Sequence, residues 1–317
     1  MKRGLRITGI VLLAAAAAVL ILLRYIGTRP AAPEDYQRSV QTGSEAEANY
    51  MANGSFSVSV YEEPALQVFK KYTIFYPSEL ETTERQYPVI VLCNGSGTPV
   101  SKYPAVPKHY ASWGFIVIGT EEEYAWNGFG AEMSVRHLER LNANPQLEEN
   151  KPNIFYQKID LDRVGIVGHS QGGVGVLNAV TAQEHQNVYR AAVSLSPTNQ
   201  ALADALEWSY DASRVHTPIL LLSGAGGGDD WVVTGEQLQA IYDDIACDKL
   251  MARRLNTAHN EVLYSADGYV TAWFMWLLQA DQQAAKAFVG DAPEIMENPM
   301  YRNQQASWRT SSQSSGG

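Results

Sequence analysis

The chain has 317 residues, a formal net charge of −10 and 45% hydrophobic residues, with a pI near 5.1. This length and apolar content suit one α/β domain of ~250 residues with appendages. The acidic balance disfavours binding to phosphate backbones, and the sequence has no basic stripe with interleaved aromatic residues. We therefore expect no nucleic-acid partner.

An uncharged apolar run begins close to the N-terminus. Lys2, Arg3 and Arg6 precede this run, which covers residues 7–23. It is longer than the ~7–15 apolar residues of a typical cleaved signal peptide and just under the ~20 that a membrane-spanning helix prefers. The pattern therefore indicates a segment for export or for membrane anchoring.

Cleavage of this segment is the less favoured outcome. The best site with small residues, at Ala31 and Ala32, is followed directly by Pro33. We therefore expect an uncleaved signal anchor over residues 1–24 that attaches the protein to a membrane. The positive cluster at the N-terminus predicts a cytoplasmic N-terminus and an extracytoplasmic catalytic domain, or a secreted domain if cleavage does occur.

Beyond this segment, the middle of the chain has a regular pattern of apolar residues, and the regions before and after it do not. Residues 25–53 are rich in Ala, Pro, Glu, Ser and Gln, which predicts a linker. Residues 304–317 are rich in Ser, Gln and Gly, which predicts a disordered tail within an extension that begins at residue 291. The catalytic domain is expected over residues 54–290.

Within the catalytic domain, strand-like and helical patterns alternate. Eight runs rich in β-branched and aromatic residues predict strands at 56–61, 72–76, 89–93, 115–119, 163–167, 191–195, 219–222 and 251–255. Helical patterns occur at 102–113, 129–142, 170–185, 234–246 and 267–279. The first two strands have no helix between them and predict a hairpin. The rest predicts an α/β fold: a mostly parallel eight-stranded sheet with helices on both faces, no large lid, and a ligand site at the carboxyl ends of the strands.

A G-x-S-x-G motif occupies residues 168–172, where an apolar strand ends and a helix begins. Such a tight turn strains the backbone of the central serine, and the residues two before and two after it must be small. Gly168 and Gly172 meet that demand. The following helix directs its N-terminal amides toward charge that develops near the serine. The pattern predicts Ser170 as a nucleophile.

A serine hydroxyl needs an imidazole to accept its proton, and three histidines follow Ser170 in the chain. His185 lies near the end of the helix after the motif, and His216 lies at the amino end of a strand, both away from the expected site. His259 follows the last predicted strand, at the carboxyl edge of the sheet. We therefore expect His259 to be the general base.

The imidazole in turn needs a carboxylate, which in this order of elements follows the penultimate strand. Two adjacent aspartates, Asp229 and Asp230, occupy that loop. We prefer Asp229, because the glycines before it allow the loop to fold back toward His259, and Asp230 remains the alternative. The same loop lacks the last glycine of a dinucleotide-binding motif and the Gly-Lys-Ser/Thr ending of a phosphate loop.

Acyl transfer also needs two N–H donors for the oxyanion. The backbone of Gln171, directly after the nucleophile, is one expected donor. The glycine-rich loop after the third strand supplies the other, for which we choose Ser96, with Gly97 as the alternative.

Two tryptophans, Trp126 and Trp231, follow strands at the expected catalytic edge. We expect them to line a substrate pocket, with core packing as the alternative. The acidic run at residues 121–123 is expected to be a solvated loop.

Cysteine and histidine usage gives no sign of a bound metal. The two cysteines, Cys93 and Cys247, are expected to be small buried hydrophobic residues, with a single disulfide between them as the alternative. Neither lies among the six histidines at metal-ligand spacing. We expect no metal and no cofactor.

The motifs at residues 94–97, 112–118, 168–173 and 268–276 resemble those of the dienelactone-hydrolase and cutinase-like polyester-hydrolase branch of the α/β-hydrolases. The resemblance covers roughly residues 55–290 and implies an esterase with an open surface cleft. Two features of that branch are missing: a tryptophan within residues 195–199, and paired cysteines near the C-terminus. Degradation of a polymer is therefore not inferred.

Together these patterns predict a serine hydrolase that cleaves carboxylic esters through an acyl-enzyme, with a small-molecule or lipid-like ester as substrate. One alternative is an acyltransferase that acts on an envelope acceptor. A second is a surface binding protein with a decayed site, whose signature would be a missing member of the triad. The sequence does not indicate an oligomeric state.

Overall fold

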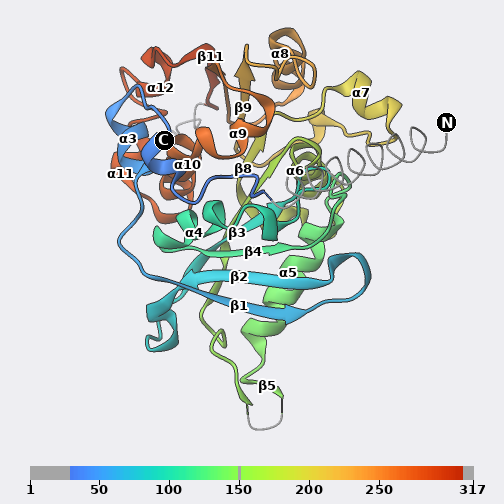
Figure 1. Ribbon diagram of the computed structural model, residues 1–317, viewed down its shortest axis with the longest axis vertical. Coiled ribbons are helices and arrows are strands. Elements are labelled where there is room, and N and C mark those ends of the chain that lie inside the picture. Colours follow the sequence, from blue (N-terminus) through green and yellow to red (C-terminus); the bar gives the residue numbers. More distant parts are fainter. Residues whose placement is uncertain (1–28, 149–150, 310–317) are drawn as a thin grey trace, which may run out of the picture. The chain divides into compact units, whose positions relative to one another are not determined.

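A nine-stranded sheet crosses the computed structural model, which describes residues 29–148 and 151–309. Its strands lie in the order β1-β2-β4-β3-β7-β8-β9-β10-β11, with β1 and β11 at opposite edges (Figure 1). All of these strands belong to one structural unit that begins at Ala32. The strands are β1 (Val58–Pro64), β2 (Lys71–Pro77), β3 (Tyr87–Cys93), β4 (Ile116–Thr120), β7 (Ile159–His169), β8 (Tyr189–Leu195), β9 (Ile219–Ala225), β10 (Lys249–Leu255) and β11 (Tyr301–Ser307).

Helices connect most of these strands. They are α2 (Tyr36–Ser39), α3 (Glu45–Met51), α4 (Ala105–Ser112), α5 (Phe129–Ala143), α6 (Gln171–Ala182), α7 (Gln200–Ala205), α8 (Gly235–Asp244), α9 (His259–Ser265), α10 (Asp267–Gln279), α11 (Gln282–Ala285) and α12 (Glu294–Glu297). A separate two-stranded hairpin, β5 (Gln146–Glu148) with β6 (Lys151–Pro152), projects away from the main sheet (Figure 1).

The strands from β4 to β10 pair in parallel, whereas β1 and β11 add to the two edges in antiparallel fashion. Parallel strands that are covered on both faces must be apolar along their whole length, and every residue of β3 is buried. One face of the sheet packs against α5, α6 and α8. On the other face Gly165 of β7 leaves room for Phe274 of α10, since a Cβ at Gly165 would lie 2.6 Å from that ring. The expected mostly parallel sheet between two helical layers is confirmed.

All eight expected strands and the hairpin of the first two are present. The strand count was nevertheless wrong, because residues 301–307 form β11 along β10 instead of a disordered tail. The composition of this segment is polar because one side of an edge strand faces solvent, and four of its seven residues are exposed.

The expected linker over residues 25–53 is also corrected, because it packs against the domain from Ala32 onward. Tyr36 and Tyr50 are buried, and Tyr50 donates a hydrogen bond to Asp281 over 2.7 Å. Glu47 of α3 is fully buried and forms an ion pair with Arg254 of β10, at 2.6 Å. A polar segment with no apolar periodicity is thus held by specific polar contacts that no sequence window reveals.

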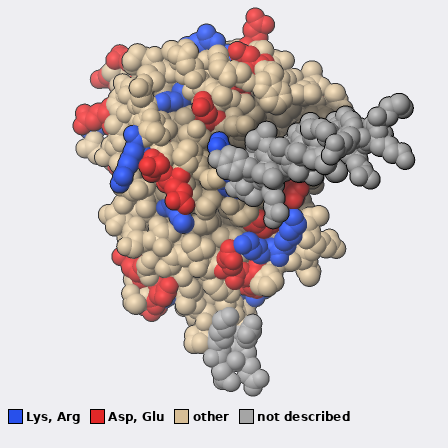
Figure 2. Space-filling view, in the orientation of Figure 1, with Lys and Arg blue, Asp and Glu red and all other residues tan. Residues whose placement is uncertain are grey.

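The predicted signal anchor over residues 1–24 lies outside the described residues. Among the residues that are described, no helix has both the length and the apolar character needed to cross a membrane. On the face in Figure 2, acidic and basic side chains are scattered over a largely uncharged surface. Cys93 and Cys247 are both buried free thiols and form no disulfide with each other.

Candidate active site

Ser170 occupies the tight turn between β7 and α6. Its backbone has φ 59° and ψ −123°, a conformation that costs a non-glycine residue energy and is kept only where the surroundings enforce it. A Cβ at Gly168 would lie 2.2 Å from the Gly172 carbonyl oxygen, and one at Gly172 would lie 2.1 Å from the Cys93 carbonyl oxygen. The glycines of the motif are therefore required by the close approach of three backbone segments.

His259 is the first residue of α9, in the loop after β10. Its Nε2 accepts a hydrogen bond from the Ser170 hydroxyl at 2.8 Å, and its Nδ1 donates to the Asp229 carboxylate at 2.6 Å. Because a carboxylate can only accept, the Nδ1 contact requires the proton on Nδ1 and leaves Nε2 free to take the serine proton. The structure thus brings together three side chains that are far apart in sequence.

The two candidate acids have different partners. Asp229 is fully buried, and besides His259 it accepts hydrogen bonds from the backbone N–H of Gly224 at 2.5 Å and from the Ser196 hydroxyl at 2.8 Å. Asp230 points away and pairs with Arg253 at 2.5 Å. Of the two, Asp229 is the one in contact with the imidazole.

Two residues that support the acid were missed by the sequence reasoning. Ser196 directly follows β8 and has a positive φ of 41°, which turns its hydroxyl toward Asp229. Arg253 of β10 donates both to the Gly224 carbonyl at 2.6 Å and to Asp230, so it holds the acid loop at its two ends. The position of Ser196 at the carboxyl end of a strand was a usable signal, whereas an arginine inside a strand gave none.

His169, next to the nucleophile, was also missed. Its Nε2 donates to the backbone carbonyl of His259 at 2.8 Å, and the two rings lie 4.5 Å apart. Burial, together with the neighbouring His259, lowers the pKa of His169 to about 3. A neutral His169 can therefore hold the His259 backbone without adding positive charge to the site.

The expected oxyanion donors, Ser96 and Gln171, each follow a residue at the tight turn, Gly95 and Ser170. Gly95 approaches it closely, since a Cβ there would lie 3.7 Å from the Ser170 Cβ, and Ser96 follows on an exposed turn. The alternative donor, the Gly97 N–H, is already used in a hydrogen bond to the Glu123 carbonyl at 3.0 Å. Gln171 begins α6, and its side-chain oxygen accepts from the Ala125 N–H at 3.0 Å, which fixes the residue in place.

The two expected pocket tryptophans differ in position. Trp231 is 69% exposed, and its ring lies edge-to-face on His259 with centroids 5.3 Å apart. Trp126 is half-buried and packs partly against the hydrophobic core. Trp231 thus borders the site, whereas core packing accounts for much of Trp126.

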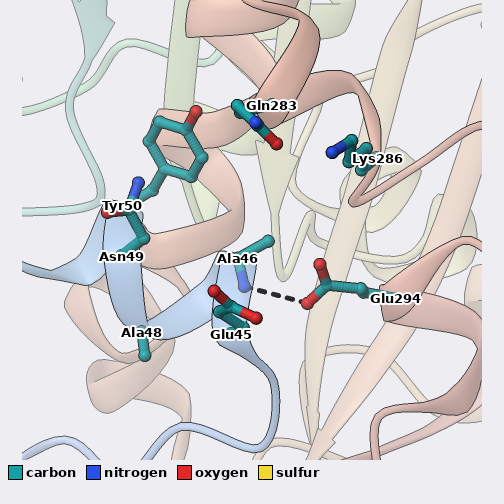
Figure 3. Close-up of a pocket in the computed structure, with 8 residues that line it drawn as sticks. All are labelled: Glu45, Ala46, Ala48, Asn49, Tyr50, Gln283, Lys286 and Glu294. Atoms are coloured by element: carbon teal, nitrogen blue, oxygen red, sulfur yellow. Dashed lines mark hydrogen bonds between the residues drawn. The ribbon is translucent and has the colours of Figure 1, made fainter.

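A cavity of about 720 Å³ lies elsewhere, between α3 and α11 (Figure 3). Its wall is partly polar and partly apolar and includes Glu45, Tyr50 and Lys286, with Glu294 accepting a hydrogen bond from the Ala46 N–H at 2.8 Å. None of the site residues above contributes to it. Within residues 29–148 and 151–309, no group of three or more His, Cys, Asp or Glu side chains is arranged to hold a metal ion.

Comparison with known proteins gives the site its family context. The chain is 28% identical over 232 residues to a Streptomyces coelicolor protein named bis(hydroxyethyl) terephthalate hydrolase. That match covers 71% of this chain and 66% of the relative, so the chain spans just under two thirds of the relative's length. A family model described as PET hydrolase-like matches residues 31–304, nearly the whole described unit. The chain, with its α/β-hydrolase fold, therefore belongs to the PET hydrolase-like family.

Proposed function

We propose that this protein hydrolyses carboxylic esters, with Ser170 as nucleophile, His259 as general base and Asp229 as the acid that orients it. The observation that carries the proposal is the continuous hydrogen-bonded chain from the Ser170 hydroxyl through His259 to Asp229. Membership of the PET hydrolase-like family supports the same chemistry. The strained backbone at Ser170 is a further mark of a functional site.

The reaction proceeds in two steps. Ser170 Oγ attacks the ester carbonyl carbon while its proton moves to His259 Nε2, and the oxyanion accepts hydrogen bonds from the N–H groups of Ser96 and Gln171. The C–O bond to the alcohol then breaks, and His259 returns the proton to the leaving oxygen. Water, activated by the same imidazole, hydrolyses the acyl-enzyme and restores Ser170. Asp229 stabilises the imidazolium that forms twice in each cycle.

A neutral ester with an aromatic group is the substrate class that we propose. Trp231 offers an exposed aromatic face directly beside His259, where it can stack on an acyl ring. The name of the Streptomyces coelicolor relative assigns to that protein a diester of an aromatic diacid. Both observations favour aromatic diesters over simple long-chain lipids.

Labelling with a fluorophosphonate probe and hydrolysis of p-nitrophenyl esters test the assignment. Ser170→Ala should abolish labelling and lower kcat by ~10⁴-fold or more, with the melting temperature unchanged. A variant that still labels and still hydrolyses would refute the role of Ser170. Added alcohol acceptors separate the alternative chemistry, because an acyltransferase would form a new ester instead of the free acid.

We also propose that residues 7–23 anchor the protein in a membrane, with the catalytic domain outside the cytoplasm. The support is the positive cluster Lys2, Arg3 and Arg6 before the apolar run. Fractionation of the full chain should recover it with membranes, and external protease should digest it in intact spheroplasts. Recovery of a shortened, freely released chain would instead indicate cleavage, and protection from protease would contradict the orientation.

A further inference from the structure

A second cavity, of about 280 Å³, lies at the edge of the sheet that carries the proposed site. Six residues line it: Val68, Lys70, Glu121, Glu122, Glu123 and Tyr124. They come from the tip of the β1–β2 hairpin and from the loop after β4. The antiparallel pairing of β2 with β4 sets Tyr72 opposite Thr120, the last residue of β4, and the Glu121 N–H donates to the Phe69 carbonyl at 3.1 Å. β4 and β7 run in the same direction in the sheet. The loop after β4, which lines the cavity, and Ser170, which follows β7, therefore both lie at the carboxyl edge of the sheet.

The cavity wall is joined directly to the oxyanion loop. The Asn94 side chain donates to the carbonyls of Thr120 at 2.9 Å and Glu122 at 2.8 Å, and the Gly97 N–H donates to Glu123. The chain runs two residues from Gly95 to Gly97, and the hydrogen bond from the Gly97 N–H leads to Glu123. The Cα atoms of Gly95 and Glu123 are therefore at most ~13 Å apart. One extended diester can therefore have its reacting carbonyl at Ser170 and its far end in this cavity.

One side of the cavity is apolar and open to solvent. Val68 is 58% exposed and Tyr124 is 62% exposed, and Leu66 beside them is 83% exposed. Behind them Phe69 packs on Phe129 with ring centroids 5.9 Å apart, which holds the hairpin tip in place. Apolar side chains gathered at the rim of a site are typical of a surface that contacts a ligand.

One of the residues that line the cavity, Glu122, has a buried carboxyl group without a hydrogen-bond partner among the described residues. Glu122 is only 6% exposed, and within the described part of the chain its side chain makes no hydrogen bond. Its Oε2 lies against α5, where a Cβ at Gly130 would be 1.9 Å away, so that glycine makes room for the carboxyl group. Burial raises the pKa of Glu122 to about 7. A buried polar group in this state gains free energy from any ligand that supplies a hydrogen-bond donor.

The charged side chains of the cavity wall determine which chemical groups can bind in the cavity. Three consecutive glutamates line the cavity, of which Glu121 accepts a hydrogen bond from the Ser101 hydroxyl at 2.6 Å. The cation of the lining, Lys70, is paired with Glu123 at 3.1 Å. A carboxylate end would be repelled, whereas a neutral hydroxyl can donate to Glu122.

We propose that this cavity is a subsite that binds the hydroxyl-bearing far end of an ester substrate, a hydroxyalkyl ester, through Glu122 and the apolar wall of Val68 and Tyr124. This inference rests on the proposed ester hydrolysis.

Two aromatic diesters that differ only at their ends test the subsite: a bis(2-hydroxyethyl) ester and its bis(2-methoxyethyl) counterpart, which lacks the donor. The wild-type protein should favour the hydroxyl-ended diester by ~10-fold or more in kcat/KM, mainly through KM. Glu122→Leu should bring this ratio close to one, whereas Glu122→Gln, which keeps an acceptor, should retain most of it. Glu236→Leu, at an exposed glutamate on α8, is the matched control and should leave the ratio unchanged. A ratio that Glu122→Leu does not alter overturns the proposal.

The exposed wall provides a second test that does not depend on a buried substitution. Tyr124→Ala should raise KM for both diesters several-fold and leave hydrolysis of p-nitrophenyl acetate, which is too short to reach the cavity, unchanged. Equal effects on the long and short esters would contradict the subsite.

Calorimetric binding of the two diesters to Ser170→Ala separates the subsite proposal from the proposal of ester hydrolysis. If the variant prefers the hydroxyl-ended diester but the wild type hydrolyses neither diester, the esterase proposal is refuted and the subsite stands. If the wild type hydrolyses both diesters and the variant shows no preference, the subsite is refuted and the esterase proposal stands.

Discussion

Two fully buried aspartates, Asp229 and Asp267, lie in two polar clusters of the same domain and have different surroundings. Asp229 accepts from a backbone amide, a serine hydroxyl and the His259 imidazole. Asp267, at the start of α10, accepts from the hydroxyls of two buried tyrosines, Tyr36 and Tyr110, the latter at 2.6 Å.

The difference lies in where each network leads. The network from Asp229 ends at Ser170, a half-buried nucleophile on a strained backbone at the sheet edge. The network from Asp267 ends at Tyr36 and Tyr110, which are both fully buried. Burial raises the pKa of Asp267 to about 7, yet nothing beside it can react with a substrate. Of these two buried aspartates, only Asp229 has hydrogen bonds that continue to a reactive group that solvent can reach.

The largest expected effect distinguishes the two neighbouring aspartates of the site. Asp229→Asn should lower kcat by ~10⁴-fold, because an amide in place of the carboxylate disfavours the required imidazole tautomer. Asp230→Asn should change kcat by less than ~10-fold, since its partner is Arg253. Steady-state hydrolysis of a p-nitrophenyl ester by both variants decides between them, and the reverse ranking would make Asp230 the acid.

A second expectation concerns the buried ion pair that holds the N-terminal segment. Glu47→Ala leaves Arg254 buried without its carboxylate partner and should lower the free energy of unfolding by about 3–5 kcal/mol. Urea unfolding measures this loss, with Glu45→Ala on the same helix, at a residue more exposed to solvent, as the control. The kcat of the folded fraction should not change. A large fall in kcat would tie this segment to the reaction.

A third expectation is a pH dependence from Asp267. Its pKa is about 7 in the folded protein and ~3.9 when unfolded, so the folded state binds more protons between these values. The free energy of unfolding should therefore fall as pH rises from ~4 to ~7, by up to ~4 kcal/mol from this group. Asp267→Asn should remove that part of the slope without altering kcat. An unchanged slope in the variant would assign the pH dependence to other groups.

The smallest expected effect tests the aromatic border of the site. Trp231→Ala should raise KM for an aromatic diester by a few-fold, because the exposed ring offers a stacking face. Trp231→Phe should restore most of the affinity, and neither substitution should shift the melting temperature by more than ~2 °C. If KM stays constant in Trp231→Ala, the ring does not contact the substrate.

Local patterns were sufficient for most of the fold. Each of the eight expected strands lies within a few residues of its observed position. Six of them, from β3 to β10, are parallel strands buried between helices, which need nearly uninterrupted apolar runs. β11 and α3 were not predicted, since their stability comes from pairing with β10 and from the Glu47 contact with Arg254. Neither interaction leaves a periodic pattern in the sequence.

The sequence by itself determined the tight turn at Ser170, with its two obligatory glycines, and the order in which acid and histidine follow it. Those features depend on short-range backbone geometry and on chain order, which a sequence states directly. Only the tertiary structure decided that Asp229, and not Asp230, meets His259, and that the Gly97 N–H is already used by Glu123. These outcomes depend on which loops face one another at the sheet edge. Adjacent residues such as Asp229 and Asp230 direct their side chains to different partners.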